Sequence, residues 1–257
     1  MHTKELFDLT GRVAIVTGGS IGLGYEMSVA LAEMGANIVI ADITEDTAKK
    51  ASQELEALRV NSLALKCDIT KPDEVEALVE ATVEKFGSID ILVNNAGISW
   101  AESAETMALK NWQKVMSVNI DGMFIVTQKV GQVMIKQQRG KIINIASVAG
   151  FVGCDPDVVN TIAYNTSKGA VISFTRDLAC KWVRHNITVN GIAPGWVPTH
   201  MSGGLLDMRR EELLRTIPMQ RFGNASELRG AVVFLASDAS SYVTGQTLVV
   251  DGGITAW

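Results

Sequence analysis

The sequence predicts an α/β fold in which one domain, residues 1–257, forms a doubly wound parallel sheet with helices on both faces. Short β-branched runs without polar alternation recur along the chain, as expected for strands that are covered on both faces. Longer segments with one-sided apolar spacing separate these runs, which favours right-handed crossovers between parallel strands. No linker, internal repeat or low-complexity tract interrupts the alternation.

The expected strands are short and rich in valine and isoleucine. They cover 13–16, 38–41, 91–93, 142–145, 187–192 and 248–250. The clearest helix signal covers 75–86, where apolar residues recur every three or four positions. Thr70 is the expected N-cap of this helix, and Gly87 is its expected C-terminal stop. A second apolar stripe runs from Met27 to Met34 and ends before Gly35.

Charge and composition narrow the choice of partners. The net charge is −5, which argues against nucleic-acid binding. No run approaches the roughly 20 apolar residues of a membrane span, and the polar segment 1–11 does not resemble a signal peptide. The three cysteines have neither C-x-x-C nor metal-ligand spacing. We therefore expect free thiols, a cytoplasmic location, and no bound metal.

A glycine-rich loop follows the first expected strand and runs into a helix. It spans Thr17–Gly24 and reads T-G-G-S-I-G-L-G. Glycines permit the positive φ and close backbone approach that a pyrophosphate needs, and a helix N-terminus offers unpaired N–H groups. The alternative is a plain glycine-rich turn, because the spacing departs from G-x-G-x-x-G. The strand before the loop and the helix after it favour phosphate binding.

An acid at the end of the second expected strand indicates the type of dinucleotide. Asp42 follows the loop at a distance where a carboxylate accepts hydrogen bonds from the adenosine ribose and repels a 2′-phosphate. No Arg or Lys lies in Ser20–Tyr25 or directly after Asp42 to neutralise such a phosphate. A turn or capping role for Asp42 is the alternative. The expected cofactor is NAD, with NADP less favoured.

Three residues together suit proton transfer at a secondary alcohol. Ser147 follows the strand at 142–145, so its hydroxyl lies at the carboxyl edge of the sheet, where ligands bind in such folds. Tyr164 and Lys168 are four residues apart, on one face of a helix. The lysine cation is expected to lower the tyrosine pKa from its usual value of about 10. Taken singly, each residue would more often be a surface or capping residue.

In combination these motifs resemble those of the short-chain dehydrogenase/reductase family, in its single-domain branch. The matching pieces appear in family order over residues 11–253: Thr17–Gly24, Asp68, Asn94-Asn95-Ala96-Gly97, Asn119, Ser147, Tyr164-x-x-x-Lys168 and Pro194-Gly195. The resemblance implies a Rossmann fold and an NAD(H)-dependent oxidoreductase that moves a hydride between nicotinamide and a secondary alcohol or ketone.

The resemblance also implies a role for each matching residue. It implies a catalytic tetrad of Asn119, Ser147, Tyr164 and Lys168, in which Asn119 helps to hold a water that connects Lys168 to bulk solvent. Asp68 is expected to hold the adenine amino group. The implied cofactor contacts are Gly18, Ser20, Ile21, Gly22, Gly24, Asp42, Asp68, Ile69, Asn95, Gly97, Tyr164, Lys168, Pro194, Gly195, Val197 and Thr199.

The substrate is expected to be a small molecule such as a sugar acid or polyol. The chain resembles gluconate 5-dehydrogenase-type and polyol dehydrogenases. It also resembles 3-oxoacyl-carrier-protein reductases, which usually prefer NADP and a basic residue near the glycine loop that this chain lacks. Ser147 precedes Tyr164 by a few more residues than is usual in the family, and the extra residues fall in the polar loop 154–160.

A mobile lid is expected at 199–216. Arg209 or Arg210 in this segment is a candidate contact for a substrate carboxylate or phosphate, although two arginines on a helix are more often solvated. Trp100 and His200 are further candidates for the pocket wall.

Two other classes of function fit less well. A serine hydrolase would need a G-x-S-x-G motif, whereas Ser147 lies in A-S-V-A-G. A catalytically silent NAD-binding protein would have no chemical need for the tetrad. The resemblance further implies a homotetramer, with the helices around 112–138 and 163–183 and the end at Trp257 packing between subunits.

Overall fold

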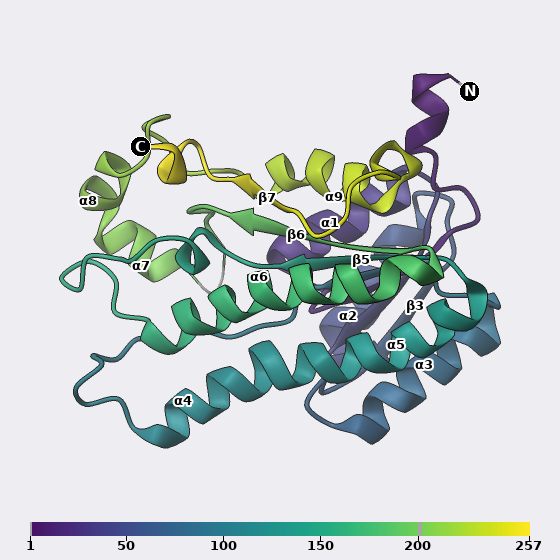
Figure 1. The fold of residues 1–257 in the computed structure, drawn as a ribbon, viewed down its shortest axis with the longest axis horizontal. Helices are drawn as coiled ribbons and strands as arrows, with labels where there is room; N and C mark the ends of the chain where they lie inside the picture. The colour runs from purple at the N-terminus through teal and green to yellow at the C-terminus, as the bar shows by residue number, and fades with distance from the viewer. Residues whose placement is uncertain (1, 200–201) are drawn as a thin grey trace.

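The computed structural model describes residues 2–199 and 202–257, and its centre is one seven-stranded sheet between two layers of helices (Figure 1). The strand order is β3-β2-β1-β4-β5-β6-β7, and every neighbouring pair is parallel. This confirms the predicted doubly wound α/β fold. The strands are β1 (Val13–Thr17), β2 (Asn37–Asp42), β3 (Ser62–Lys66), β4 (Ile91–Asn94), β5 (Gly140–Ile145), β6 (Ile187–Pro194) and β7 (Thr247–Val250).

Helices connect the strands and cover the sheet on both sides. They are α1 (Gly22–Glu33), α2 (Glu45–Glu56), α3 (Pro72–Phe86), α4 (Leu109–Met116), α5 (Met123–Gln137), α6 (Ile162–Trp182), α7 (Gly203–Met208), α8 (Arg210–Arg215) and α9 (Arg229–Ala236). A π-helical turn, Ser117–Gly122, joins α4 to α5 in one continuous rod. Short 3-10 turns occur at Thr3–Phe7, Val148–Gly150, Val183–His185, Ala225–Leu228, Asp238–Ser240 and Ile254–Ala256.

The central strand β1 shows why both faces of the sheet are buried. Its alternate residues point to opposite faces, and all five are buried. Ala14 and Val16 belong to the core beneath α1, α2 and α9. Val13 and Ile15 belong to the core beneath α3, α5 and α6. The apolar runs lack polar alternation because each strand contributes to two cores.

In the third βα unit the apolar pattern missed one strand, and one expected helix cap was wrong. Strand β3 was not among the expected strands, because only Ser62 of its five residues is buried and its apolar signal is correspondingly weak at the edge of the sheet. Thr70 is not the cap of α3: Lys71 is, and Pro72 occupies the first helical turn. Thr70 instead donates its backbone N–H and its hydroxyl to Asp68 Oδ1.

The ends of the helices follow the other expectations. Gly87 ends α3 with φ 80°. Gly35, with φ 94°, directly follows Met34, the C-cap of α1. Within the described ranges, no helix is long and apolar enough to cross a membrane. The same residues contain no group of three side chains arranged to hold a metal ion.

The sheet has a topological switch point between β1 and β4. From β1 the chain builds outward through β2 and β3, and then returns to β4 on the other side of β1. The loops after β1 and β4 therefore separate at the carboxyl edge of the sheet and leave a crevice, which is where ligands bind in open α/β sheets.

Candidate active site

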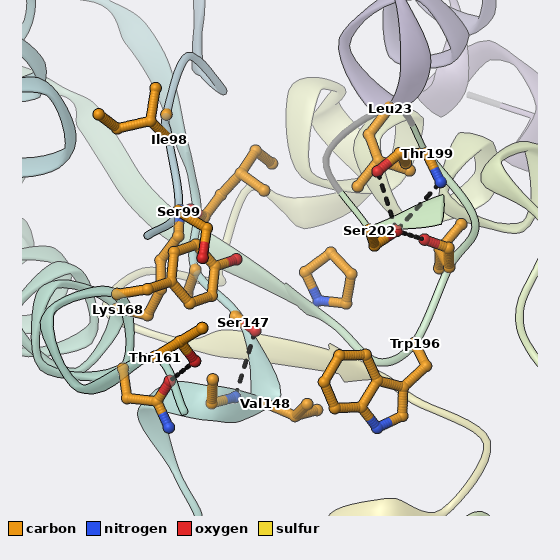
Figure 2. A pocket seen from close by; sticks show the side chains of 18 of the residues that line it. Leu23, Ile98, Ser99, Ser147, Val148, Thr161, Lys168, Trp196, Thr199 and Ser202 are labelled. Carbon is orange, nitrogen blue, oxygen red and sulfur yellow. Dashed lines mark hydrogen bonds between the residues drawn. The ribbon is translucent and has the colours of Figure 1, made fainter. Parts of the chain in front are cut away.

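A cavity of about 770 Å³ opens at the carboxyl edge of the sheet. Five strands lead to its wall, and one residue at the end of each strand or just after it lines the cavity. These residues are Gly18, Asp42, Asn95, Ser147 and Gly195. Figure 2 shows Ser147 and Lys168 on one side of this pocket and Trp196, Thr199 and Ser202 on the other.

Most of the residues expected from the sequence meet in this single cavity. The residues that line it are Gly18, Ile21, Gly22, Gly24, Asp42, Asp68, Ile69, Asn95, Gly97, Ser147, Tyr164, Lys168, Pro194, Gly195, Val197 and Thr199. Ser20 and Asn119 are not among the lining residues. Both are buried directly behind the wall, where they hydrogen-bond to neighbours that form it.

The glycine loop is held tightly against β4. Asn95 Nδ2 donates to the carbonyl oxygens of Thr17 and Gly18 at 3.0 and 2.9 Å. A Cβ on Gly24 would lie 2.0 Å from the Gly18 carbonyl oxygen, so no other residue fits there. Ile21 caps α1 without any side-chain hydrogen bond, so the N–H groups of the first turn have no capping side chain. This cradle fits a dinucleotide pyrophosphate.

Asp42 has a fixed orientation at the end of β2. Its Oδ2 accepts a hydrogen bond from Ser20 Oγ at 2.5 Å, and its Oδ1 accepts one from the backbone N–H of Thr44 at 3.2 Å. Ser20 Oγ also lies 3.2 Å from Thr47 Oγ1. Ser20 therefore acts on the cavity through Asp42 rather than by lining it.

Asp68, in the loop after β3, is also oriented by hydrogen bonds. One carboxylate oxygen accepts both hydrogen bonds from Thr70, and the backbone N–H of Asp68 donates to Glu74 Oε2 at 2.8 Å. Ile69 follows at the wall and is buried against Gly122. Thr70 thus occupies only Oδ1 of the Asp68 carboxylate, which lines the cavity.

Tyr164 and Lys168 lie one helical turn apart on α6, as their spacing predicted. Lys168 Nζ lies 5.4 Å from the centre of the Tyr164 ring and donates to the Ile145 carbonyl oxygen at 2.7 Å. Lys168 is only 6% exposed, and burial lowers the pKa of its ammonium to about 8. The buried ammonium group has few hydrogen-bond partners to offset the loss of its hydration.

The pKa of Tyr164 departs from the expectation. Burial raises the pKa of the hydroxyl above its usual value of 10.0, and the neighbouring Ser147 hydroxyl acts in the opposite direction. Lys168 does not produce the expected lowering in the protein alone, where desolvation of the phenolate is the larger effect. Ser147 accepts a hydrogen bond from the Ala149 N–H at 3.2 Å, so its own O–H proton can be donated to the Tyr164 oxygen or to a ligand oxygen beside it.

Asn119 lies in the π-helical turn rather than in regular α-helix. Its Oδ1 accepts from the Ile98 N–H at 2.8 Å, and its Nδ2 donates to the Ile98 carbonyl and to Ser167 Oγ, both at 2.9 Å. These bonds tie the loop after β4 to α6, which carries Tyr164 and Lys168. Both amide hydrogens are used in the protein, so the water relay assigned to Asn119 stays a prediction.

Several residues expected in the wall beyond the cofactor motifs do not line the cavity. Trp196 lines it, whereas Trp100 points its indole N–H at Glu102 and is not part of the wall. Arg209 pairs with Glu212, and Arg210 stacks on Phe222, so neither lines the cavity. His200 lies outside the described residues.

The extra loop before Tyr164 forms part of the cavity wall. Cys154 lines the cavity and accepts a hydrogen bond from Asn165 Nδ2 at 3.5 Å. The Thr161 hydroxyl, whose hydrogen bond is drawn in Figure 2, donates to Asn165 Oδ1 at 2.9 Å. Val159 packs with Leu206 and Leu213 of the 199–216 segment. The segment is thus anchored to the loop by apolar contacts.

Comparisons with known proteins identify the family. A family model described as enoyl-(acyl carrier protein) reductase matches residues 18–255. The crystal structure of a short-chain type dehydrogenase/reductase from Mycobacterium marinum superposes with a TM-score of 0.95 at 35% identity, over 98% of this chain and 99% of that one. The chain belongs to the short-chain dehydrogenase/reductase family. It is accordingly an oxidoreductase that acts on CH–OH or keto groups.

Members of this family that resemble the chain differ in their substrates. The 2-dehydro-3-deoxy-D-gluconate 5-dehydrogenase of Dickeya dadantii is 44% identical over 250 residues, or 96% of each protein. The 3-oxoacyl-[acyl-carrier-protein] reductase of Synechocystis is 40% identical over 248 residues, 96% of this chain and 98% of the reductase. The gluconate 5-dehydrogenase of Burkholderia cenocepacia, in complex with NADP and tartrate, has a TM-score of 0.94 at 37% identity over the whole of both chains.

Proposed function

We propose that this oxidoreductase uses NAD(H) and acts on a sugar acid or polyol, in the manner of a gluconate 5-dehydrogenase. The observation that carries the proposal is the convergence of Ser147, Tyr164 and Lys168 on the same cavity as the glycine loop and Asp42. The first group suits a carbinol or carbonyl oxygen, and the second suits a dinucleotide.

In this proposal the reacting oxygen of the substrate lies between Ser147 and Tyr164. Ser147 donates its O–H to that oxygen, since its Oγ is oriented by the Ala149 N–H. Tyr164 takes the hydroxyl proton on oxidation and returns it on reduction. Bound nicotinamide supplies the site that accepts or donates the hydride. Lys168 and Asn119 are assigned to holding the nicotinamide ribose and the proton relay, respectively.

The preference for NAD rests on the charge around the ribose position. Asp42 is fixed by Ser20 and Thr44, and no basic residue of the loop after Gly19 offsets its charge. A 2′-phosphate would therefore meet an oriented carboxylate. The related gluconate 5-dehydrogenase of Burkholderia cenocepacia was crystallised with NADP.

The sugar-acid assignment has a specific rival within the same family. The Dickeya relative supports a keto sugar acid, whereas the Synechocystis relative supports a 3-oxoacyl thioester. The absence of a basic residue in the glycine loop favours the first, because the reductases usually carry one and use NADP. A silent NAD-binding protein is the third alternative, which the intact tetrad disfavours.

One experiment separates these functions. NADH and NADPH are titrated side by side by nicotinamide fluorescence, followed by turnover with 5-keto-D-gluconate, L-sorbose, a 3-oxoacyl thioester and a simple ketone. Tighter NADH binding and turnover of the keto sugar acid would support the proposal. Preference for NADPH with the thioester would support the ketoreductase, and tight binding without turnover on any substrate would support the silent protein.

We also propose a homotetramer and a reducing cytoplasmic compartment. Phe124 of α5 and Phe174 of α6 form an edge-to-face pair with centroids 6.4 Å apart, and Phe124 is 48% exposed. Trp257 is 75% exposed at the C-terminus. Burying these groups between copies would remove apolar surface from water. All three cysteines are free, which suits a reducing compartment.

A further inference from the structure

One arginine lines the cavity without an acidic partner in the part of the chain that the structure describes. Arg215 is the last residue of α8 and lies in the wall beside Leu213 and Thr216. Ion pairs engage several other arginines, but none joins Arg215 to a described carboxylate. Lys168 is the other cation of the described wall, and it is buried against the Ile145 carbonyl.

The neighbouring charges leave the Arg215 charge available. Glu212 also lines the cavity and lies three residues before Arg215, on the same face of α8. Its carboxylate pairs with Arg209 on its other side, with Nη1 and Oε1 3.4 Å apart. Arg210 stacks its guanidinium 5.3 Å from the centre of the Phe222 ring. Residues 202–216 therefore contain three arginines with different surroundings: Arg209 is ion-paired, Arg210 is stacked on an aromatic ring, and Arg215 lines the cavity.

The position of Arg215 is set by apolar packing. Leu213 is 2% exposed and packs in a small core with Val159 and Leu206. This core joins α8 to α7 and to the loop before Tyr164. Arg215 is thereby presented to the cavity from an anchored helix rather than from a free loop end, which reduces the conformational entropy lost when it binds a ligand.

We propose that Arg215 binds the carboxylate of an acidic substrate while Ser147 and Tyr164 hold its reacting C–O group. This inference rests on the proposed function, because it names the part of a sugar acid that the site recognises. Guanidinium presents a planar fork of donors that matches a carboxylate. Asp155 and Glu212 line the same cavity and disfavour a second negative charge. The ligand class is therefore a polyhydroxy monocarboxylate.

The test compares two ligands that differ only at the proposed contact. D-Gluconate carries a carboxylate at C1, where D-glucitol carries a hydroxymethyl group. Each is titrated calorimetrically into the full chain loaded with NADH, so that binding is read without turnover. The wild-type chain should bind gluconate at least about tenfold more tightly than glucitol, as expected for a charge-assisted contact.

The variant Arg215→Gln should lose roughly 10- to 100-fold in gluconate affinity and keep its glucitol affinity. Arg215→Lys should retain part of the gluconate affinity, since it keeps the charge but loses the fork. Arg210→Gln is the matched control: it removes one positive charge from the same helix, away from the cavity, and should leave the gluconate preference unchanged. Arg215 is exposed, so circular dichroism should show that its variants fold normally.

Two results would overturn the inference. One is equal gluconate binding by the wild-type chain and Arg215→Gln. The other is a wild-type chain that binds gluconate no more tightly than glucitol. Failure of the proposed function is distinguishable from both. If the wild-type chain binds gluconate through Arg215 but oxidises neither ligand, the substrate proposal falls and the carboxylate subsite stands. If it oxidises gluconate and Arg215→Gln matches it in binding, the reverse holds.

Discussion

Ser20 Oγ and Asp42 Oδ2 lie 2.5 Å apart, so a side-chain hydrogen bond joins the glycine loop to the end of β2 beside the cavity. Ser20 is 7% exposed and does not line the cavity, whereas Asp42 does. The serine thus orients the acid without contacting the ligand itself. In the proposed function, the cofactor preference depends on this pair.

Asp42→Ser should shift the cofactor preference toward NADPH. The variant removes the acceptor for the ribose hydroxyls and the charge that repels a 2′-phosphate, so the ratio of NADPH to NADH affinity should rise roughly 10- to 100-fold. Fluorescence titration with both cofactors measures the ratio. Asp46→Ser is the control, because Asp46 is an exposed acid in the first turn of α2 outside the cavity. An unchanged ratio in Asp42→Ser would show that this carboxylate does not contact the ribose.

Tyr164→Phe should separate chemistry from binding. Loss of the hydroxyl removes the proposed proton donor and acceptor, so turnover should fall roughly 10²- to 10⁴-fold. NADH affinity should stay within a few-fold, because the ring remains in the wall. Tyr25→Phe makes the same change outside the cavity, where the Tyr25 hydroxyl donates to Glu54 at 2.6 Å, and should leave turnover unchanged. If Tyr164→Phe retains full turnover, another group transfers the proton.

Lys168→Met should change how stability depends on pH. Burial lowers the pKa of Lys168 from 10.5 to about 8, so between these values the unfolded chain binds more protons than the folded one. Raising the pH through this window therefore stabilises the wild-type chain, while the methionine variant has no such group to titrate. The wild-type chain should gain up to about 3 kcal/mol relative to the variant between pH 8 and 10.5. Below pH 8 the difference should be constant.

Urea unfolding of both chains at several pH values measures this difference. All other groups titrate in both proteins, so the comparison isolates Lys168. A stability difference that stays flat up to pH 10.5 would mean that Lys168 is solvated well enough to keep its ordinary pKa.

The sequence was most informative where chemistry depends on local order along the chain. The glycine loop, Asp42, Ser147 and the Tyr164–Lys168 pair each follow a strand or share a helix face, so their meeting at one sheet edge follows from the fold class. Strand β3 was harder to predict because an edge strand needs little apolar surface, and the Thr70 cap failed because Pro72 fixes the start of α3.

The cavity residues outside the cofactor and tetrad motifs could not be predicted from the sequence in the same way. Trp100 and Trp196 each follow an expected cofactor motif within three residues, yet of the two only Trp196 lines the cavity, because Glu102 holds the Trp100 indole. Arg215 carries no sequence signal that separates it from Arg209 and Arg210. Its orientation results from the packing of Leu213 and from competition among neighbouring charges, which are tertiary properties.

Gly24→Ala should damage both stability and cofactor binding, although it adds a single methyl group. The new Cβ would lie 2.0 Å from the Gly18 carbonyl oxygen and 2.5 Å from Asn95 Nδ2. Because the first of these is backbone, the loop itself would have to move. We expect a loss of at least about 1–3 kcal/mol in the free energy of unfolding and a large loss of NADH affinity.

Gly230→Ala provides the contrast for this prediction. Gly230 lies on the exposed side of α9, and a Cβ there would meet nothing within 4 Å. Alanine should stabilise the helix by about 0.5–1 kcal/mol and leave NADH binding unchanged. Thermal unfolding with and without NADH measures both effects. If Gly24→Ala binds NADH normally, the loop can relax around a side chain, and the close contact between Gly18 and Gly24 is not what shapes the phosphate cradle.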